Sequence, residues 1–330
     1  MRGRGEQGEI ASGRPRVIRA LSIVDAELSI AWHEARLGDK VAKRVLAPHC
    51  NKTTERRLRR VLANEFSLLT TASQARHAPR CAVNIYETDL LLNQYLLFHY
   101  GTADDQFPYG FGPSDALFYP SRCVTEFLPA IGQISRALDL GCAVGRSTFE
   151  LARCADEVVG IDLSSRFISA AQAVQKTGQI EINILEEGER FTTVTRKLDP
   201  QLDRSKCRFL VADALRTPDH IGTFDLVLAA NLIDRVPSPA DLLREIKRLV
   251  RADGYVILAS PYTWLEEFTP RESWLADSTG NTLSRIQKCL EPELVLVTTK
   301  DLPFLIREHA RKFQWSVAQA SVWKKAGARS

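Results

Sequence analysis

A short apolar segment that ends in a glycine turn constrains this chain more than any other feature. Residues 136–152 read RALDLGCAVGRSTFELA, which predicts a strand ending at Asp139, a tight turn from Gly141 to Gly145 and then a helix. The later segment VVGIDLS places Asp162 at the tip of a second strand. In a parallel α/β fold such a turn lets the backbone approach a ligand, and an acidic residue about 20 residues on can accept both ribose hydroxyls of a nucleoside. The two segments therefore predict a nucleoside-binding, Rossmann-like domain.

The details of the turn separate two classes of enzyme. A dinucleotide fingerprint that begins at Gly141 would have glycines at 143 and 146, where this chain has Ala143 and Arg146. The last glycine of that fingerprint lets helix and strand pack closely, so Arg146 disfavours a nicotinamide dehydrogenase.

Two further segments favour an S-adenosylmethionine-dependent methyltransferase. LVADA places Asp213 at a third strand tip, and FDLVLAANLIDRV places Asn231 just past a fourth. In such enzymes these positions hold the adenine amine and line the methyl-transfer face. The candidate cofactor-binding residues are Asp139, Gly141, Cys142, Ala143, Gly145, Asp162, Leu163, Asp213, Ala214 and Asn231.

Strand and helix patterns alternate over the second half of the chain. The predicted strands are 137–140, 157–161, 208–211, 224–229 and 255–260, and the predicted helices are 86–100, 123–128, 148–153, 166–176 and 239–250. This alternation favours right-handed βαβ units and a mostly parallel sheet, seven-stranded, with helices on both faces. Two strand-like runs, 294–298 and 313–323, are joined by the basic stretch IREHARK and predict an antiparallel pair at the sheet edge.

Composition divides the chain into four parts. Residues 1–16 are rich in Gly and Arg and predict a disordered basic tail, whereas 17–80 predict a helical N-terminal extension. The methyltransferase domain is expected over 81–325, followed by a tail over 326–330. Residues 1–80 hold 16 Lys and Arg against 8 Asp and Glu. Solvated helix faces explain this charge, so a nucleic-acid partner is not expected.

The cysteines and histidines are scattered along the chain. None of the seven cysteines forms a CxxC pair, and the six histidines form no HxH or HExxH group, so no metal and no disulfide framework are expected. No run of about 18 uncharged apolar residues predicts a membrane span. The expected location is the cytoplasm.

Several long segments resemble one narrow family. They are YETDLLLNQYLLFHYG, FPYGFGPSDALFYPSRCV, LDLGCAVGRSTFELAR, FDLVLAANLIDRV, SPYTWLEEFTPRESWL and DLPFLIREHARKFQWSVAQASVWKK, and the match runs from about residue 86 to about residue 324. These segments resemble the methyltransferase domain of ovothiol-biosynthesis proteins, also described as 4-mercaptohistidine N1-methyltransferases. The resemblance implies methyl transfer from S-adenosylmethionine to an imidazole ring nitrogen of 5-thiohistidine (4-mercaptohistidine), giving ovothiol. Residues 1–80 resemble neither the DinB-like nor the iron-dependent sulfoxide synthase region of that family, so a separate sulfoxide synthase protein is expected to supply the substrate.

A small zwitterionic acceptor needs a partner for each of its charges. Arg122 or Arg307 could hold its carboxylate, and Glu267 or Asp234 its ammonium group. Candidate ring walls are Tyr86, Tyr95, Phe98, Tyr109, Phe111, Tyr262 and Trp264, although core packing is the commoner role of each.

Candidate catalytic residues are few, because methyl transfer depends more on alignment than on a strong base. Asn231 faces the transfer site, and His99 or His309 could relay a proton from the ring. Cys142 is better explained as a small buried side chain than as a nucleophile. Two alternatives stay open: a methyltransferase acting on another small heterocycle or thiol, and a non-catalytic binding module with this fold.

Overall fold

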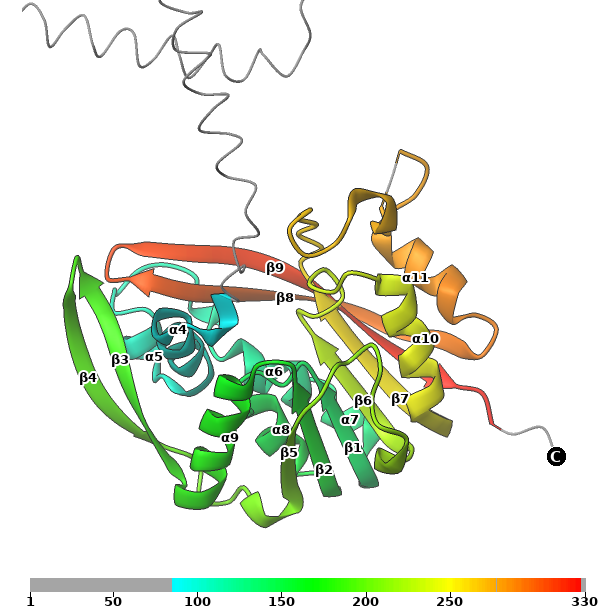
Figure 1. Ribbon diagram of the computed structural model, residues 1–330, viewed down its shortest axis with the longest axis horizontal. Helices are drawn as coiled ribbons and strands as arrows, with labels where there is room; N and C mark the ends of the chain where they lie inside the picture. The colour runs from blue at the N-terminus through cyan, green and yellow to red at the C-terminus, as the bar shows by residue number, and fades with distance from the viewer. Residues whose placement is uncertain (1–84, 277, 328–330) are drawn as a thin grey trace, which may run out of the picture. The chain divides into compact units, whose positions relative to one another are not determined.

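The computed structural model describes residues 85–276 and 278–327. The predictions for 1–16 and 17–80 lie outside these residues, as do 81–84 and the last three positions of the predicted tail. A seven-stranded sheet with the order β5-β2-β1-β6-β7-β9-β8 forms the centre of the described part (Figure 1). Its strands are β1 (Ile134–Leu140), β2 (Ala155–Asp162), β5 (Cys207–Val211), β6 (Phe224–Ala230), β7 (Val250–Ser260), β8 (Leu294–His309) and β9 (Lys312–Lys325).

The pairing of these strands confirms the predicted sheet. Strands β5, β2, β1, β6 and β7 run parallel to one another, whereas β9 is antiparallel to both β7 and β8. Six of the seven residues of β6 are buried, as expected for a central strand covered on both faces. The carboxyl ends of β1, β2, β5 and β6 therefore point to the same edge of the sheet.

Helices cover both faces of the sheet, as predicted. Alternate residues of β6 belong to different cores: Leu226 and Leu228 pack in one, and Val227 and Ala229 pack in the other. The first core includes α4, α6, α8 and α9, and the second includes α10 and α11. These helices, with the short α5 and α7, are α4 (Asp89–Tyr100), α5 (Ala103–Gln106), α6 (Tyr119–Thr125), α7 (Leu128–Ile131), α8 (Arg146–Leu151), α9 (Ser165–Thr177), α10 (Pro239–Leu249) and α11 (Thr282–Leu290). Five 3-10 turns complete the described elements: η3 (Ile85–Glu87), η4 (Ser114–Ala116), η5 (Arg204–Lys206), η6 (Asp219–Ile221) and η7 (Arg271–Ser273).

A second, two-stranded sheet was not predicted from the sequence. Strands β3 (Gln179–Glu187) and β4 (Arg190–Lys197) form an antiparallel hairpin that turns at Gly188, which has a φ of 58°. The hairpin lies against α4, as does the distal half of β8 (Figure 1). Helix α11 was also missed.

The basic stretch IREHARK is not a connector, which corrects the prediction. Its first residues belong to β8, and the chain turns only at 310–311. The strand continues through this basic stretch because Arg307 is buried and paired. Its guanidinium donates to Glu186 of β3 across 2.7 Å and to the carbonyl of Asp105 across 2.8 Å. A buried cation with two such partners can continue a strand.

Within the described ranges, no helix is both long enough and apolar enough to cross a membrane.

Candidate active site

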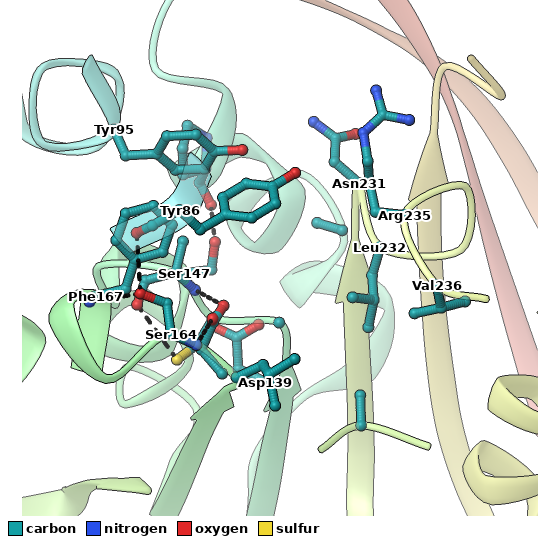
Figure 2. Close-up of a pocket in the computed structure, with 18 of the residues that line it drawn as sticks. Tyr86, Tyr95, Asp139, Ser147, Ser164, Phe167, Asn231, Leu232, Arg235 and Val236 are labelled. Carbon is teal, nitrogen blue, oxygen red and sulfur yellow. Dashed lines mark hydrogen bonds between the residues drawn. The ribbon is translucent and has the colours of Figure 1, made fainter. Parts of the chain in front are cut away.

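A cavity of about 500 Å³ opens where the carboxyl ends of four parallel strands meet. Asp139 lies near the end of β1, and Asp162 is the last residue of β2. Asp213 lies in the loop after β5, and Asn231 comes directly after β6. Figure 2 shows residues of this cavity, with Asp139 near the strand ends and Asn231 on the facing wall. Ligands of open parallel sheets bind in this crevice. The four strand-tip residues thus line a single cavity.

The glycine turn is bent by its own backbone hydrogen bonds. The N–H groups of Gly141 and Cys142 both donate to the carbonyl of Ile161, each across 2.9 Å. Gly141 and Gly145 have positive φ values of 73° and 90°. A Cβ on Gly145 would come within 2.8 Å of the Phe209 ring. Gly145 therefore lets the turn pack on β5 and does not itself line the cavity, unlike the other predicted cofactor residues.

Asp162 fastens the turn to the start of α9. Its Oδ2 accepts from the Ala143 N–H across 2.9 Å, and its Oδ1 accepts from the Ser164 N–H across 2.8 Å. Burial raises the pKa of this carboxyl above its usual range. Each carboxylate oxygen has further lone-pair capacity, so Asp162 can also accept from the two hydroxyls of a ribose.

Asp139 lies fully buried beside the same turn. Its Oδ2 accepts from the Thr148 hydroxyl across 2.7 Å. Burial, together with the neighbouring charge of Asp162, raises the pKa of Asp139 to about 7. Two buried carboxyls that resist ionisation favour a cationic ligand beside them, because a positive charge offsets the cost of their desolvation.

Comparison with known proteins places this site in a class. Residues 138–258 match the family described as Methyltransferase domain. Among curated relatives, Ubiquinone biosynthesis O-methyltransferase of Leptothrix cholodnii is 24% identical over 195 residues, which cover 58% of this chain and 72% of that protein. The protein of the same name from Albidiferax ferrireducens is 26% identical over 137 residues, or 42% of this chain and 44% of that protein.

Solved structures with a similar arrangement are more distant in sequence. N-methyltransferase NodS from Bradyrhizobium japonicum WM9, in complex with S-adenosyl-L-homocysteine, is 15% identical, covers 71% of this chain and 98% of that one, and has a TM-score of 0.42. A SAM-dependent methyltransferase from Methanosarcina mazei is 17% identical, covers 62% and 99% of the two chains, and has a TM-score of 0.43.

Within the described part of the chain, residues 138–258 match a methyltransferase domain family and have a Rossmann-like fold. The matched residues 138–258 run from β1 into β7 and carry all four strand-tip residues. The cavity has the features that S-adenosylmethionine requires: the turn leaves room for a backbone approach, Asp162 can bind the ribose, and two carboxyls with raised pKa values suit a sulfonium cation.

The other half of the cavity is an aromatic chamber. Tyr86 of η3 and Tyr95 of α4 have ring centroids 6.3 Å apart, and Tyr86 also contacts Phe268 at 6.2 Å. Figure 2 shows Tyr86 and Tyr95 on one side of the cavity and Asn231 and Arg235 on the other. Glu267 lies at the exposed rim beside Phe268. Of the predicted substrate residues, four line this chamber: Tyr86, Tyr95, Phe98 and Glu267.

His99 lines the cavity, but its chemistry does not suit the predicted proton relay. Its Nδ1 accepts from the Arg146 backbone N–H across 3.4 Å. Burial, and then the nearby Arg146 charge, lower the pKa of His99 to about 3. The imidazole is therefore neutral near pH 7 and is a weak base.

The two predicted arginine clamps lie outside the cavity, which corrects both predictions. Arg122 donates to Glu126 across 2.7 Å and to the carbonyl of Pro303 across 3.0 Å. Arg307 is held by Glu186, as described above. Asp234 is likewise occupied, because its Oδ2 accepts from the Thr263 N–H across 2.8 Å. These side chains stabilise the fold rather than face the acceptor.

Five other predicted residues also lie away from the cavity. His309 ends β8, where its Nδ1 accepts from the Arg311 N–H, and the Tyr109 hydroxyl donates to the carbonyl of Ala310. The five residues are His309, Tyr109, Phe111, Tyr262 and Trp264. Phe111 is 74% exposed, and Tyr262 and Trp264 line a second cavity of about 360 Å³ next to β9. The sequence could not show that β8 carries His309 away from the cofactor.

Several cavity residues were not predicted. Arg235 lies four positions after Asn231, within the segment FDLVLAANLIDRV. Its charge in that segment was the signal that could have identified it as a cavity residue. Tyr119 is the first residue of α6. Ser147, Phe167, Phe268 and Ile306 line the cavity without any motif that would have distinguished them. Within residues 85–276 and 278–327, no group of three or more His, Cys, Asp or Glu is arranged to hold a metal.

Proposed function

We propose that this protein transfers the methyl group of S-adenosylmethionine to an imidazole ring nitrogen of 5-thiohistidine. The observation that supports this function best is that the cofactor residues and the aromatic chamber line one continuous cavity. The chamber is walled by rings and has an arginine and a glutamate among its lining residues. A small aromatic zwitterion matches these features, and the resemblance to thiohistidine methyltransferases names the particular one.

The charged residues of the chamber take the roles first assigned to other side chains. Arg235 lies at the cavity with its side chain about one quarter exposed; its NH1 is 3.1 Å from Oδ2 of Asp234 and donates to the carbonyl of Thr263 across 2.8 Å. The remaining N–H groups of a guanidinium can bind a carboxylate. Glu267 can pair with the acceptor ammonium group at the rim. Arg235 and Glu267 therefore replace Arg122, Arg307 and Asp234 as the proposed clamps.

The proposed mechanism relies on alignment. S-adenosylmethionine supplies an activated methyl group on a sulfonium when it is bound. Tyr86, Tyr95 and Phe98 confine the acceptor ring, so that its unprotonated nitrogen can face the cofactor side of the cavity. Holding a nucleophile in line can lower the activation barrier by several kcal/mol. For well-oriented intramolecular reactions the gain starts at roughly 7 kcal/mol. A neutral imidazole nitrogen is already nucleophilic, so the weak basicity of His99 is no obstacle.

The acceptor itself must come from a different reaction. Forming 5-thiohistidine requires oxidative insertion of sulfur into histidine, a reaction of a different class from methyl transfer. We propose that a separate sulfoxide synthase protein supplies it.

The curated relatives suggest a second function, O-methylation of a phenolic acceptor, because both relatives described above are named ubiquinone biosynthesis O-methyltransferases. A phenol would also fit between the rings. Phenol methylation, however, gains from a base that takes the hydroxyl proton. His99, the histidine lining this cavity, has a pKa of about 3, which favours an acceptor that needs no such base.

Product analysis by mass spectrometry distinguishes these functions. The purified full chain is incubated with S-adenosylmethionine and, in separate reactions, with 5-thiohistidine, histidine, a simple thiol and a catechol. We expect one methyl group to be added to 5-thiohistidine, on a ring nitrogen by fragmentation. Methylation of the catechol alone would replace the proposal with the O-methyltransferase. Cofactor binding with no product from any acceptor would support a non-catalytic module.

A further inference from the structure

Tyr119 contacts the one strand-tip residue that ends in an amide. Its hydroxyl donates to Oδ1 of Asn231 across 2.8 Å, although the two residues are 112 positions apart in the chain. Both side chains line the cavity. The sequence motifs gave no reason to connect them.

Asn231 is held at two further points besides this hydrogen bond. Its backbone N–H donates to the carbonyl of Ala259 on the neighbouring strand across 2.7 Å. Its φ is 51°, a left-handed conformation that asparagine tolerates better than most residues. The backbone is thus fixed, and the remaining freedom is rotation of the side-chain amide.

The hydrogen bond from Tyr119 decides which end of the amide faces the ligand. Since Oδ1 accepts from Tyr119, the NH2 group is left to donate. Figure 2 shows the amide nitrogen of Asn231 pointing into the space opposite the Tyr86 ring. Arg235 lies on the same side of the cavity. The wall that faces the chamber therefore presents hydrogen-bond donors and a positive charge.

Tyr119 is itself rigid. Its side chain is 2% exposed and packs against Phe98 and Phe304, with ring centroids 5.9 Å and 4.7 Å away. Burial raises the pKa of the hydroxyl well above its usual range, so the proton stays on the oxygen and the group remains a donor.

We propose that Tyr119 is a positioning residue that orients the Asn231 amide, so that its NH2 group donates to an electron-rich atom of the acceptor beside Arg235. This inference rests on the proposed function and narrows its acceptor to molecules with an anionic or strongly accepting group at that wall. In 5-thiohistidine the sulfur and the carboxylate are such groups.

Two variants separate the orientation of the amide from its donor group. Tyr119→Phe removes the hydroxyl but keeps the NH2. Asn231→Asp keeps the hydrogen bond from Tyr119 and a residue type that tolerates the left-handed backbone, but replaces the NH2 donor with an anionic oxygen. Tyr109→Phe is the matched control, because it also removes a hydroxyl that donates to a carbonyl, but outside the cavity.

The test measures steady-state methylation of 5-thiohistidine and, separately, cofactor affinity by calorimetry. We expect Tyr119→Phe to lower kcat/KM for the acceptor about tenfold, as for loss of one oriented hydrogen bond, with cofactor affinity within about twofold of wild type. Asn231→Asp should lower kcat/KM about a hundredfold, since it adds repulsion to the loss of the donor. Tyr109→Phe should match the wild type.

A cycle with Asn231→Ala tests whether Tyr119 acts through the amide. We expect Tyr119→Phe to cause no further loss of kcat/KM in the Asn231→Ala background. An undiminished tenfold loss there would overturn the proposal, as would wild-type kcat/KM in Tyr119→Phe. If the wild-type protein binds the cofactor but leaves 5-thiohistidine unmodified, the proposed function itself fails, a result distinct from either of these.

Discussion

The two halves of the cavity are built in different ways. The cofactor half comes from the ends of adjacent parallel strands, and most of its ligand-facing groups are backbone or carboxyl groups within the span from Asp139 to Asp213. The acceptor half combines η3, α4, α6, the loop after β7 and β8, which are separated by more than 200 residues of chain. A local motif can thus specify a cofactor site, whereas an acceptor site depends on which distant side chains the fold brings to the cavity.

Removing the carboxylate proposed to bind the ribose should have the largest effect. The loss should be confined to cofactor affinity. Asp162→Ala removes a carboxylate that also accepts from the N–H groups of Ala143 and Ser164. We expect affinity for S-adenosylmethionine to fall about a hundredfold or more, close to 3 kcal/mol, because charge-assisted hydrogen bonds are lost. Calorimetric titration measures this, with Asp156→Ala as the control, an exposed carboxylate near the start of the same strand. Unchanged affinity in Asp162→Ala would refute the placement of the ribose.

The glycine turn should show the next largest effect, on folding rather than on binding alone. In Gly145→Ala the new Cβ would lie at a φ of 90° and 2.8 Å from the Phe209 ring. We expect the free energy of unfolding to drop by about 3 kcal/mol from backbone strain plus overpacking. Gly188→Ala has a positive φ but open space, and should lose only about 1 kcal/mol. Urea denaturation compares the two, and equal losses would show that the contact with β5 is unimportant.

Within the acceptor half, one arginine should matter and another should not. We expect Arg235→Gln to lower kcat/KM for a zwitterionic acceptor about thirtyfold through a higher KM, since a charged partner of the carboxylate is lost. Arg122→Gln should leave KM unchanged, because Arg122 is paired with Glu126 and bonded to the carbonyl of Pro303. Cofactor affinity should change in neither variant. A larger rise of KM in Arg122→Gln than in Arg235→Gln would instead identify Arg122 as the residue that binds the acceptor carboxylate.

The smallest expected effect is the pH dependence of cofactor binding. The pKa of Asp139 is about 7 without ligand, and a cationic ligand favours its ionised form. As pH falls through 7 the carboxyl becomes protonated, so affinity should fall, by about tenfold between pH 8 and pH 6, with proton uptake by the free protein opposing binding. Calorimetry across this range should show proton release on binding near pH 6. Asp139→Asn should bind with a flat profile, whereas an unchanged slope would assign the effect to another group.

The sequence predicted the sheet, and it predicted strand-tip residues that line one cavity, because both depend on short-range patterns. Buried strands such as β6 read as apolar runs, and strand-tip residues follow them directly. The β3–β4 hairpin escaped notice because β4 is mostly exposed and rich in Thr and charged residues, so no apolar alternation marked it. The tertiary contacts with α4 and β8, which no local pattern encodes, support it instead.

The acceptor half could be predicted only in part: four of the named residues, Tyr86, Tyr95, Phe98 and Glu267, line the cavity. An arginine and a glutamate were expected, and the cavity has both, but Arg122 and Arg307 were named instead of Arg235. All three arginines have a carboxylate partner, and what separates them is position: Arg235 lines the cavity, whereas Glu126 and Glu186 hold the other two away from it. These positions are set only when the chain is folded. Aromatic residues pose the same problem, since Tyr86 faces the cavity and Phe111 does not.

The most direct test of the central claim, that one cavity holds cofactor and acceptor together, is a crystal structure of the protein with S-adenosyl-L-homocysteine and 5-thiohistidine. We expect the ribose to lie on Asp162 and the imidazole between Tyr86 and Asn231, with a ring nitrogen facing the cofactor sulfur. Density for the acceptor at a separate place, such as the cavity beside Trp264, would contradict this account. So would the absence of density for both ligands between β1 and β6.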